Sequence, residues 1–150
     1  MDTARERAEG ARAVAHITIE HSANLADHHD VQALVGAVHT AAAAHGLTPL
    51  DGLRTRAVTR NHYRIAAGDP DYAFVAITVR VGPGRDAAAR RTYLETILDA
   101  AEAHIGATPS PLAVAWSAEV TEIDAAFRIN RNEVRARIAE QRQQRPESLR

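Results

Sequence analysis

The order of the expected elements constrains this chain most, because a strand, a long helix and a second strand occur twice in succession. Asp30 and Asp86 can each cap a helix through the free N–H groups of its first turn. A strand, a long helix and a strand favour a parallel crossover. Both units can therefore share one four-stranded sheet with both helices on one face, which predicts an α+β fold. The expected strands are residues 15–20, 53–65, 72–81 and 112–123.

The helical segments carry apolar residues at helical spacing, and these residues are expected to face the sheet. The opposite face of the sheet also needs cover, because the run Phe74-Val75-Ala76-Ile77 is apolar at every position. We expect oligomerisation to bury that second face. The expected helical core positions are Val31, Leu34, Val35, Val38 and Ala42 in the first helix, and Leu94, Ile97, Leu98, Ala101 and Ile105 in the second.

The length of 150 residues fits one domain with a sizeable core. Residues 1–14 are charged and small, and we expect a flexible extension there. Residues 15–127 should form the domain, and residues 128–150 should form a C-terminal helical arm and tail, with a helix at 131–143.

Composition excludes several classes of protein. The net charge of −1 gives no overall field that would attract nucleic acid or an anionic membrane. The chain has no cysteine, which rules out disulfides and thiolate metal sites and fits a cytoplasmic location. No apolar run approaches the length that spans a bilayer. We therefore expect neither nucleic acid nor a membrane as a partner.

Several segments, taken in order, resemble the 5-carboxymethyl-2-hydroxymuconate isomerases, which are of the tautomerase type. The resemblance covers about residues 15 to 135 and implies a homotrimer. It also implies cofactor-free isomerisation of a carboxylated enol or unsaturated keto-acid, as in the catabolism of aromatic compounds. The segments are AHITIEHSANL (15–25), GLTPLDGLRTR (46–56), GDPDYAFVAITVRVGPGR (68–85) and SAEVTEI (117–123).

The resemblance assigns the base to the amine of an N-terminal proline and the binding of substrate carboxylates to arginines. These arginines fall on Arg54 and Arg85, and the proline position falls on Ala15. Inside a chain, the nitrogen of Ala15 is an amide whose lone pair is delocalised, so it is no base. In a chain that begins at Ala15, for example after a start at Val14, it would be an amine with a pKa near 8, which nearby cations lower.

His16 and His62 are alternative bases, since histidine titrates near pH 6.5 without help. His16, Tyr72 and Phe74 complete the expected substrate-binding set, and the two aromatic residues share one strand face. Core packing is the competing interpretation for Tyr72 and Phe74. Trp116 is expected in the core or in a trimer interface.

No metal is expected, because the histidines lack the spacing of a ligand set, and the resemblance implies that no cofactor is needed. His39 and His45, for example, are six positions apart and do not share a helix face well. The arginine-rich residues 128–145 contain no interleaved aromatics after Arg128, so a solvated helix or an arm across a neighbouring subunit is favoured over a nucleic-acid contact.

Three functions remain open from the sequence. The first, which we favour, is an isomerase that acts on a small carboxylate substrate such as 5-carboxymethyl-2-hydroxymuconate. The second is a non-catalytic trimeric homologue that binds small carboxylates. The third is an interaction module that uses the basic tail.

Overall fold

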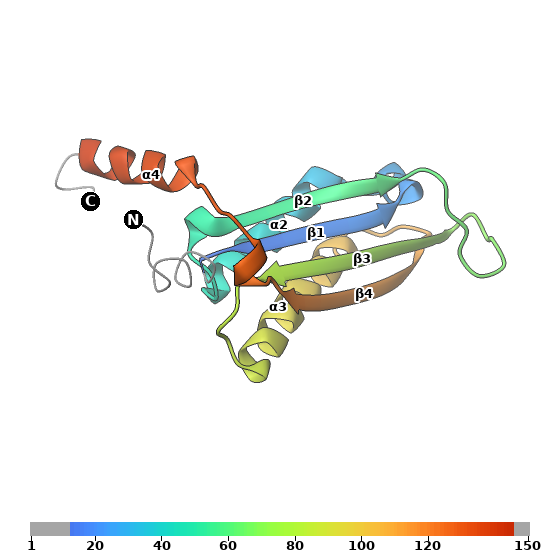
Figure 1. The fold of residues 1–150 in the computed structure, drawn as a ribbon. Coiled ribbons are helices and arrows are strands. Elements are labelled where there is room, and N and C mark those ends of the chain that lie inside the picture. The colour runs from blue at the N-terminus through green and yellow to red at the C-terminus, as the bar shows by residue number, and fades with distance from the viewer. Residues whose placement is uncertain (1–12, 146–150) are drawn as a thin grey trace.

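The computed structural model describes residues 13–145 and contains one four-stranded sheet. The strands lie in the order β2-β1-β3-β4 (Figure 1). β1 runs parallel to β2, β3 runs parallel to β4, and β1 and β3 are antiparallel. The predicted α+β fold with two β-α-β units is confirmed. The bounds are β1 (Ala15–Ser22), β2 (Leu53–Arg60), β3 (Tyr72–Val81) and β4 (Ala113–Glu122).

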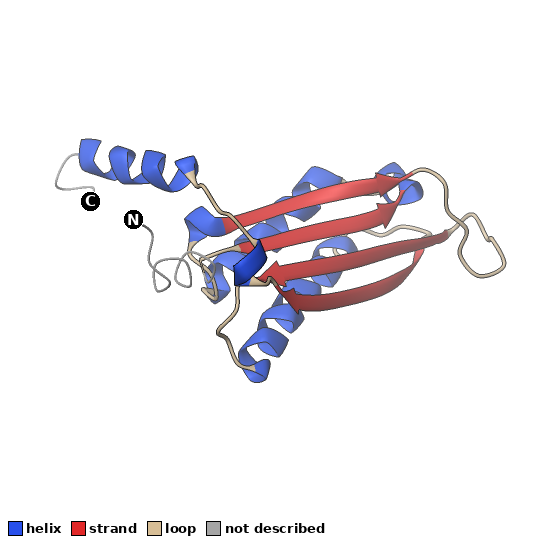
Figure 2. Ribbon diagram, viewed as in Figure 1, coloured by secondary structure: helices blue, strands red, loops and turns tan. Residues whose placement is uncertain are grey.

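Two long helices, α2 (Val31–His45) and α3 (Ala87–Gly106), cover one face of the sheet (Figure 2). The carboxylate of Asp30 accepts a hydrogen bond from Ala33 N at 3.0 Å, and that of Asp86 accepts one from Ala89 N at 2.8 Å. Both predicted caps are confirmed. None of the helices in residues 13–145 is both long and apolar enough to cross a membrane.

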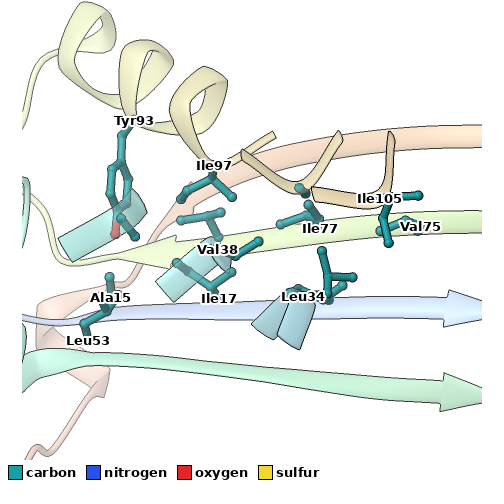
Figure 3. Packing of buried hydrophobic residues seen from close by; sticks show 14 of the residues in the cluster. Ala15, Ile17, Leu34, Val38, Leu53, Val75, Ile77, Tyr93, Ile97 and Ile105 are labelled. Atoms are coloured by element: carbon teal, nitrogen blue, oxygen red, sulfur yellow. The ribbon is translucent and has the colours of Figure 1, made fainter. Parts of the chain in front are cut away.

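The core lies between the sheet and the two helices, where alternate residues of β1 and β3 meet α2 and α3 (Figure 3). On α3 the structure buries Tyr93 completely, whereas Leu94 and Leu98 are only half-buried. Tyr93 was not among the predicted core residues. Its ring points from α3 toward the end of the sheet where Ala15 and Leu53 lie (Figure 3).

The face of the sheet that points away from the helices is polar at the end where β1 begins. His16 and Thr18 lie on this open face, and in the strand register Arg54 and Arg80 are the neighbours of His16 on β2 and β3. The expectation of a second apolar face was therefore wrong for this half of the sheet. Side chains alternate along a strand, so Val75 and Ile77 belong to the helix side.

β2 ends at Arg60, five residues before the predicted end of that strand at Ile65. Residues 61–71 form a loop between β2 and β3. At the other end of the molecule, β4 leads into the short helix η3 (Ala125–Phe127) and then into α4 (Glu133–Gln144), which projects from the body of the fold (Figure 1). The predicted helix at 131–143 is confirmed with a shift of one or two residues.

α4 is attached to the domain through the short helix η2 (Leu50–Gly52). The side-chain amide of Asn132 donates to the carbonyl of Asp51 at 2.9 Å. The guanidinium of Arg135 forms an ion pair with the Asp51 carboxylate at 3.0 Å. Residues 1–12 and 146–150, which include most of the predicted flexible extension and the end of the predicted tail, lie outside the described residues.

Candidate active site

Ala15 is the first residue of β1 and lies between Leu53 on β2 and Val81 on β3. Its side chain is fully buried, as is that of Val14 before it. The carbonyl of Val14 accepts a hydrogen bond from Gly82 N at 3.2 Å. In this form of the chain, the nitrogen of Ala15 is thus an amide inside a packed segment.

The residue before Val14 fills the space next to Gly52. A Cβ built on Gly52 would overlap with the carbonyl oxygen of Ala13, so the two backbones meet in the room that a glycine leaves. Arg135 Nη2 lies 3.5 Å from the same carbonyl oxygen. Residues 13 and 14 therefore occupy the approach to the Ala15 nitrogen, and α4 holds them from outside.

The two arginines expected to bind carboxylates flank this end of the sheet from opposite faces. Arg54 lies on the open face beside His16. Arg85 lies in the loop before α3, where its guanidinium donates to the carbonyls of Leu47 at 2.7 Å and Gly82 at 3.3 Å. Arg85 thus helps to hold the loop after α2 against the end of β3.

Tyr93 lies on the helix side of the same end. Burial raises the pKa of its phenol, which the nearby Thr48 hydroxyl and the charge of Arg85 partly oppose. The phenolic oxygen has no hydrogen-bond partner of good geometry within residues 13–145. This buried hydroxyl was not predicted, because a tyrosine between Thr92 and Leu94 belongs to no recognisable motif.

His16 is a poor candidate for the base. Burial, followed by the charges of Arg56 and Arg54, lowers the pKa of its imidazole from 6.5 to about 4. Its Nδ1 lies 3.1 Å from Arg56 Nη1. Because a guanidinium only donates, Nδ1 accepts this bond and the proton of the neutral ring lies on Nε2. Near pH 7 His16 is therefore a neutral hydrogen-bond donor.

Four guanidiniums gather around His16 on the open face, and we call them the arginine cluster: Arg54, Arg56, Arg80 and Arg128. Burial, followed by the charges of Arg54 and Arg80, also lowers the pKa of Arg128. Among residues 13–145, no carboxylate lies within 4.0 Å of any of these four side chains. Because side chains alternate along a strand, the sequence could have predicted that Arg54 and Arg56 share one face of the sheet. The position of Arg128 could not be predicted in this way, because it depends on the path of the chain after β4.

The remaining predicted site residues lie elsewhere in the subunit. Tyr72 and Phe74 share the open face as expected, but Phe74 is six positions from Arg80 along β3, about 20 Å at roughly 3.3 Å per residue. Phe74 contacts Tyr63 edge to face, with ring centres 6.3 Å apart. Tyr72 lines a cavity of about 240 Å³ under the loop of residues 61–71. His62 is an exposed residue of the same loop. One subunit therefore does not bring these residues to Arg54.

Trp116 is half-buried and packs against the core from β4, in line with the predicted core position. His39 and His45 are separated: Nδ1 of His39 lies 2.9 Å from the Thr55 hydroxyl, whereas the ring of His45 contacts Tyr93 with centres 5.2 Å apart. In the part of the chain that the structure describes, no three side chains of the ligating types are grouped so that they could hold a metal ion.

Comparison with known proteins places this geometry in a family. The profile described as 5-carboxymethyl-2-hydroxymuconate isomerase matches residues 15–138, so the match begins at the first residue of β1. The 5-carboxymethyl-2-hydroxymuconate Delta-isomerase of Escherichia coli is 30% identical over 121 residues, which cover 81% of this chain and 96% of that protein.

Solved structures agree with the sequence comparison. A crystal structure of 5-carboxymethyl-2-hydroxymuconate delta-isomerase superposes with a TM-score of 0.78 at 23% identity, over 93% of this chain and 99% of the other. A 5-carboxymethyl-2-hydroxymuconate isomerase from Deinococcus radiodurans R1 superposes with a TM-score of 0.75 at 24% identity, over 85% and 96%. The chain belongs to the 5-carboxymethyl-2-hydroxymuconate isomerase family.

Proposed function

We propose that this protein is a cofactor-free isomerase that moves a proton within a carboxylated enol such as 5-carboxymethyl-2-hydroxymuconate. The observation that carries the proposal is the family match, which starts at Ala15, the residue at which the resemblance places the N-terminal proline. Arg54 supports it, because a guanidinium in register with the neighbour of Ala15 can bind a substrate carboxylate and stabilise the charge of a dienolate.

The catalytic base would be the amine of Ala15 in a form of the protein that begins there. A free α-amine has a pKa near 8, and nearby arginines lower it toward the range of an effective base. The neutral amine would take a proton from one carbon, leaving an ammonium and a dienolate, and the ammonium would return the proton to another carbon.

Loss of residues 13 and 14 would create the room that this reaction needs. The space beside Gly52, now filled by the Ala13 carbonyl, would open in front of the amine. The N–H of Gly82, which now donates to Val14, would become available to an oxygen of the substrate. Backbone donors of this kind stabilise developing negative charge.

A second candidate function is a non-catalytic trimeric homologue that binds small carboxylates. It is favoured by the burial of Val14 and by the contact of Arg135 with Ala13, which keep the Ala15 nitrogen an amide. In that case the arginines would bind the same class of ligand without turnover.

The two candidates are separated by comparing a chain that begins at Ala15 with the chain of 150 residues, using 5-carboxymethyl-2-hydroxymuconate and following its ultraviolet absorbance. The isomerase proposal expects turnover in the shorter chain, at least 100-fold above the longer one, and loss of turnover after acetylation of the amine. If both chains turn over equally and His16→Gln stops them, the base is a histidine. If neither turns over but both bind the substrate, the binding function is correct.

We also propose a homotrimer working in the cytoplasm, with residues 15–127 as the folded unit and residues 128–150 as an arm. The junction of the folded unit and the arm supports assembly, because Phe127 and Ile129 are 89% and 82% exposed there. Large apolar side chains exposed together are typical of protein interfaces.

A further inference from the structure

α4 is attached to the domain at its first turn, and this attachment also reaches the segment before β1. Arg135 lies in that turn, and its Nη2 lies 3.0 Å from Asp51 Oδ1 and 3.5 Å from the carbonyl oxygen of Ala13. One guanidinium group therefore joins α4, η2 and the segment that precedes Ala15. Beyond this turn the helix projects away from the sheet (Figure 1).

Asp51 is the anchor of these contacts, because α4 binds both its side chain and its backbone. Its carboxylate pairs with Arg135, and its carbonyl accepts a hydrogen bond from Asn132 Nδ2 at 2.9 Å. Asn132 Oδ1 in turn accepts a hydrogen bond from Arg135 N at 3.2 Å, which caps the helix. The side chains of Asp51 and Arg135 are 21% and 39% exposed, so salt screens their ion pair less than a fully exposed pair. We call Asp51, Asn132 and Arg135 the α4 latch.

The segment under the α4 latch contains the peptide bond between Val14 and Ala15. Val14 is fully buried, and its carbonyl accepts the hydrogen bond from Gly82 N at 3.2 Å. The carbonyl of Ala13 fills the space at Gly52. A peptidase binds its substrate as an exposed, extended chain, so it reaches this bond only after the segment has left the sheet. The rate of cleavage then follows the fraction of molecules in which the segment is open.

We propose that the bond between Val14 and Ala15 is a processing site and that the α4 latch protects it from peptidases. When Asp51 and Arg135 are paired, the segment before Ala15 stays on the sheet. When they separate, only the contacts within the domain hold the segment, and a peptidase reaches the bond. Hydrolysis consumes one water molecule and breaks the C–N bond, which leaves a carboxylate on Val14 and a free α-amine on Ala15.

The α4 latch would in this way control how much of the protein carries the amine that the isomerase needs. That consequence rests on the proposed function. The protection of the bond does not, because it depends only on the contacts of the segment and can be measured without substrate or turnover.

Hydrogen exchange of the Gly82 amide, followed by NMR in the chain of 150 residues, measures release of the segment, because this amide donates to it. In Asp51→Asn and in Arg135→Gln the Gly82 amide should exchange at least threefold faster than in the parent chain. The amide of Ile123, which donates to β3 at the same end of the sheet with a bond of 2.8 Å, is the internal reference and should keep its rate.

Digestion of the same proteins by a non-specific aminopeptidase measures cleavage, and intact mass follows the form that begins at Ala15. Asp51→Asn and Arg135→Gln should each yield this form at least threefold faster than the parent chain. The double variant should yield it no faster than the faster single variant, because both changes break one ion pair. Asn132→Ser keeps a residue that can cap α4 but removes the donor to Asp51, so its rates should lie between those of the parent and Asp51→Asn.

Two matched variants are the controls. Asp99→Asn removes an exposed carboxylate from α3, and Arg142→Gln removes a guanidinium from the last turn of α4. Both should leave the exchange of Gly82 and the rate of digestion unchanged. Asp51→Glu keeps the negative charge and should stay closer to the parent chain than Asp51→Asn.

Two results would overturn the proposal. If the Gly82 amide exchanges at the same rate in the parent and in the latch variants, α4 docks on η2 without holding the segment. If the latch variants yield the form that begins at Ala15 no faster than the parent, other contacts protect the bond. Turnover by the chain that begins at Ala15 enters neither measurement, so this inference and the isomerase proposal can fail separately.

Discussion

The carbonyl oxygen of Ala13 lies against the α-carbon of Gly52, in the place where any other residue at position 52 would carry its Cβ. The contact joins the segment before β1 to the turn before β2. It means that residue 52 must be glycine as long as the chain passes through Ala13. It also means that the same space becomes open when the chain begins at Ala15.

Gly52→Ala should therefore destabilise the chain of 150 residues and be tolerated in the chain that begins at Ala15. Overpacking of this kind costs about 1–3 kcal/mol of unfolding free energy. Urea denaturation of both chains measures the difference. Gly36→Ala is the control, since Gly36 lies within α2 with nothing within 4 Å of its added Cβ, and it should stabilise both chains by about 0.5–1 kcal/mol. Equal losses from Gly52→Ala in the two chains would show that Ala13 does not fill this space.

The two arginines that the family resemblance pairs should give different results when each is replaced. Arg85→Ala leaves the carbonyl of Leu47 without its guanidinium donor, so it should lower the unfolding free energy by about 1–3 kcal/mol. Arg54→Ala removes one of four crowded charges and should leave stability unchanged or slightly higher, while it weakens dicarboxylate binding. Thermal unfolding and titration calorimetry, run on both variants, separate the two roles. A large loss of stability in Arg54→Ala would contradict this division.

The fold could be predicted from the sequence because its signals are local. Asp30 and Asp86 begin the helices where their carboxylates can cap them, and the alternation in residues 72–81 marks β3. The end of β2 could not be predicted, since residues 61–65 contain β-favouring Tyr63 and Ile65. β2 stops at Arg60 because its partner β1 stops at Ser22, directly opposite. A strand needs a neighbour, and the sequence does not show where the neighbour ends.

The candidate site could be predicted only in part, for a related reason. Arg54 and Ala15 were found by resemblance, and both lie at the predicted end of the sheet. The low pKa of His16 arises from burial and from arginines on other elements, so no local pattern reveals it. The position of Arg128 depends on the path of the chain after β4 and η3, which residue types do not reveal. Tyr72 and Phe74 lie at the opposite end of β3 from Arg80, because the strand is 10 residues long.

Assembly should depend on the apolar residues at the end of η3 and in the segment that follows it. Phe127 and Ile129 are among the most exposed large apolar side chains in residues 13–145. If they contact a neighbouring copy, Phe127→Ser combined with Ile129→Ser should convert trimers into monomers at micromolar concentration. Light scattering coupled to size-exclusion chromatography measures the mass. Leu50→Ser is the control, because it replaces another large apolar side chain that is 61% exposed. It tests whether any such replacement on the surface lowers the mass. A trimer that persists in the double variant would place the interface elsewhere.

The stability of the protein should fall in acid through His16. The pKa of its imidazole is about 4 in the folded chain and near 6.5 in the unfolded chain, because burial and the surrounding arginines oppose the charged ring. Between these values the unfolded chain binds a proton that the folded chain does not, so the unfolding free energy decreases as the pH falls from 6.5 toward 4. Above pH 6.5 the ring is neutral in both states and contributes no pH dependence.

His16→Gln should remove this part of the acid loss, so that its unfolding free energy changes less between pH 6.5 and pH 4 than that of the parent chain. Urea denaturation at several pH values measures both curves. Burial also lowers the pKa of His29. This lowering decreases the unfolding free energy in acid equally in the parent chain and in the His16 variant, so it cancels when the two are compared. His62→Gln, in the exposed loop after β2, is the control and should follow the parent chain. Parallel curves for His16→Gln and the parent would show that burial and the arginines do not lower the pKa of His16 in the folded protein.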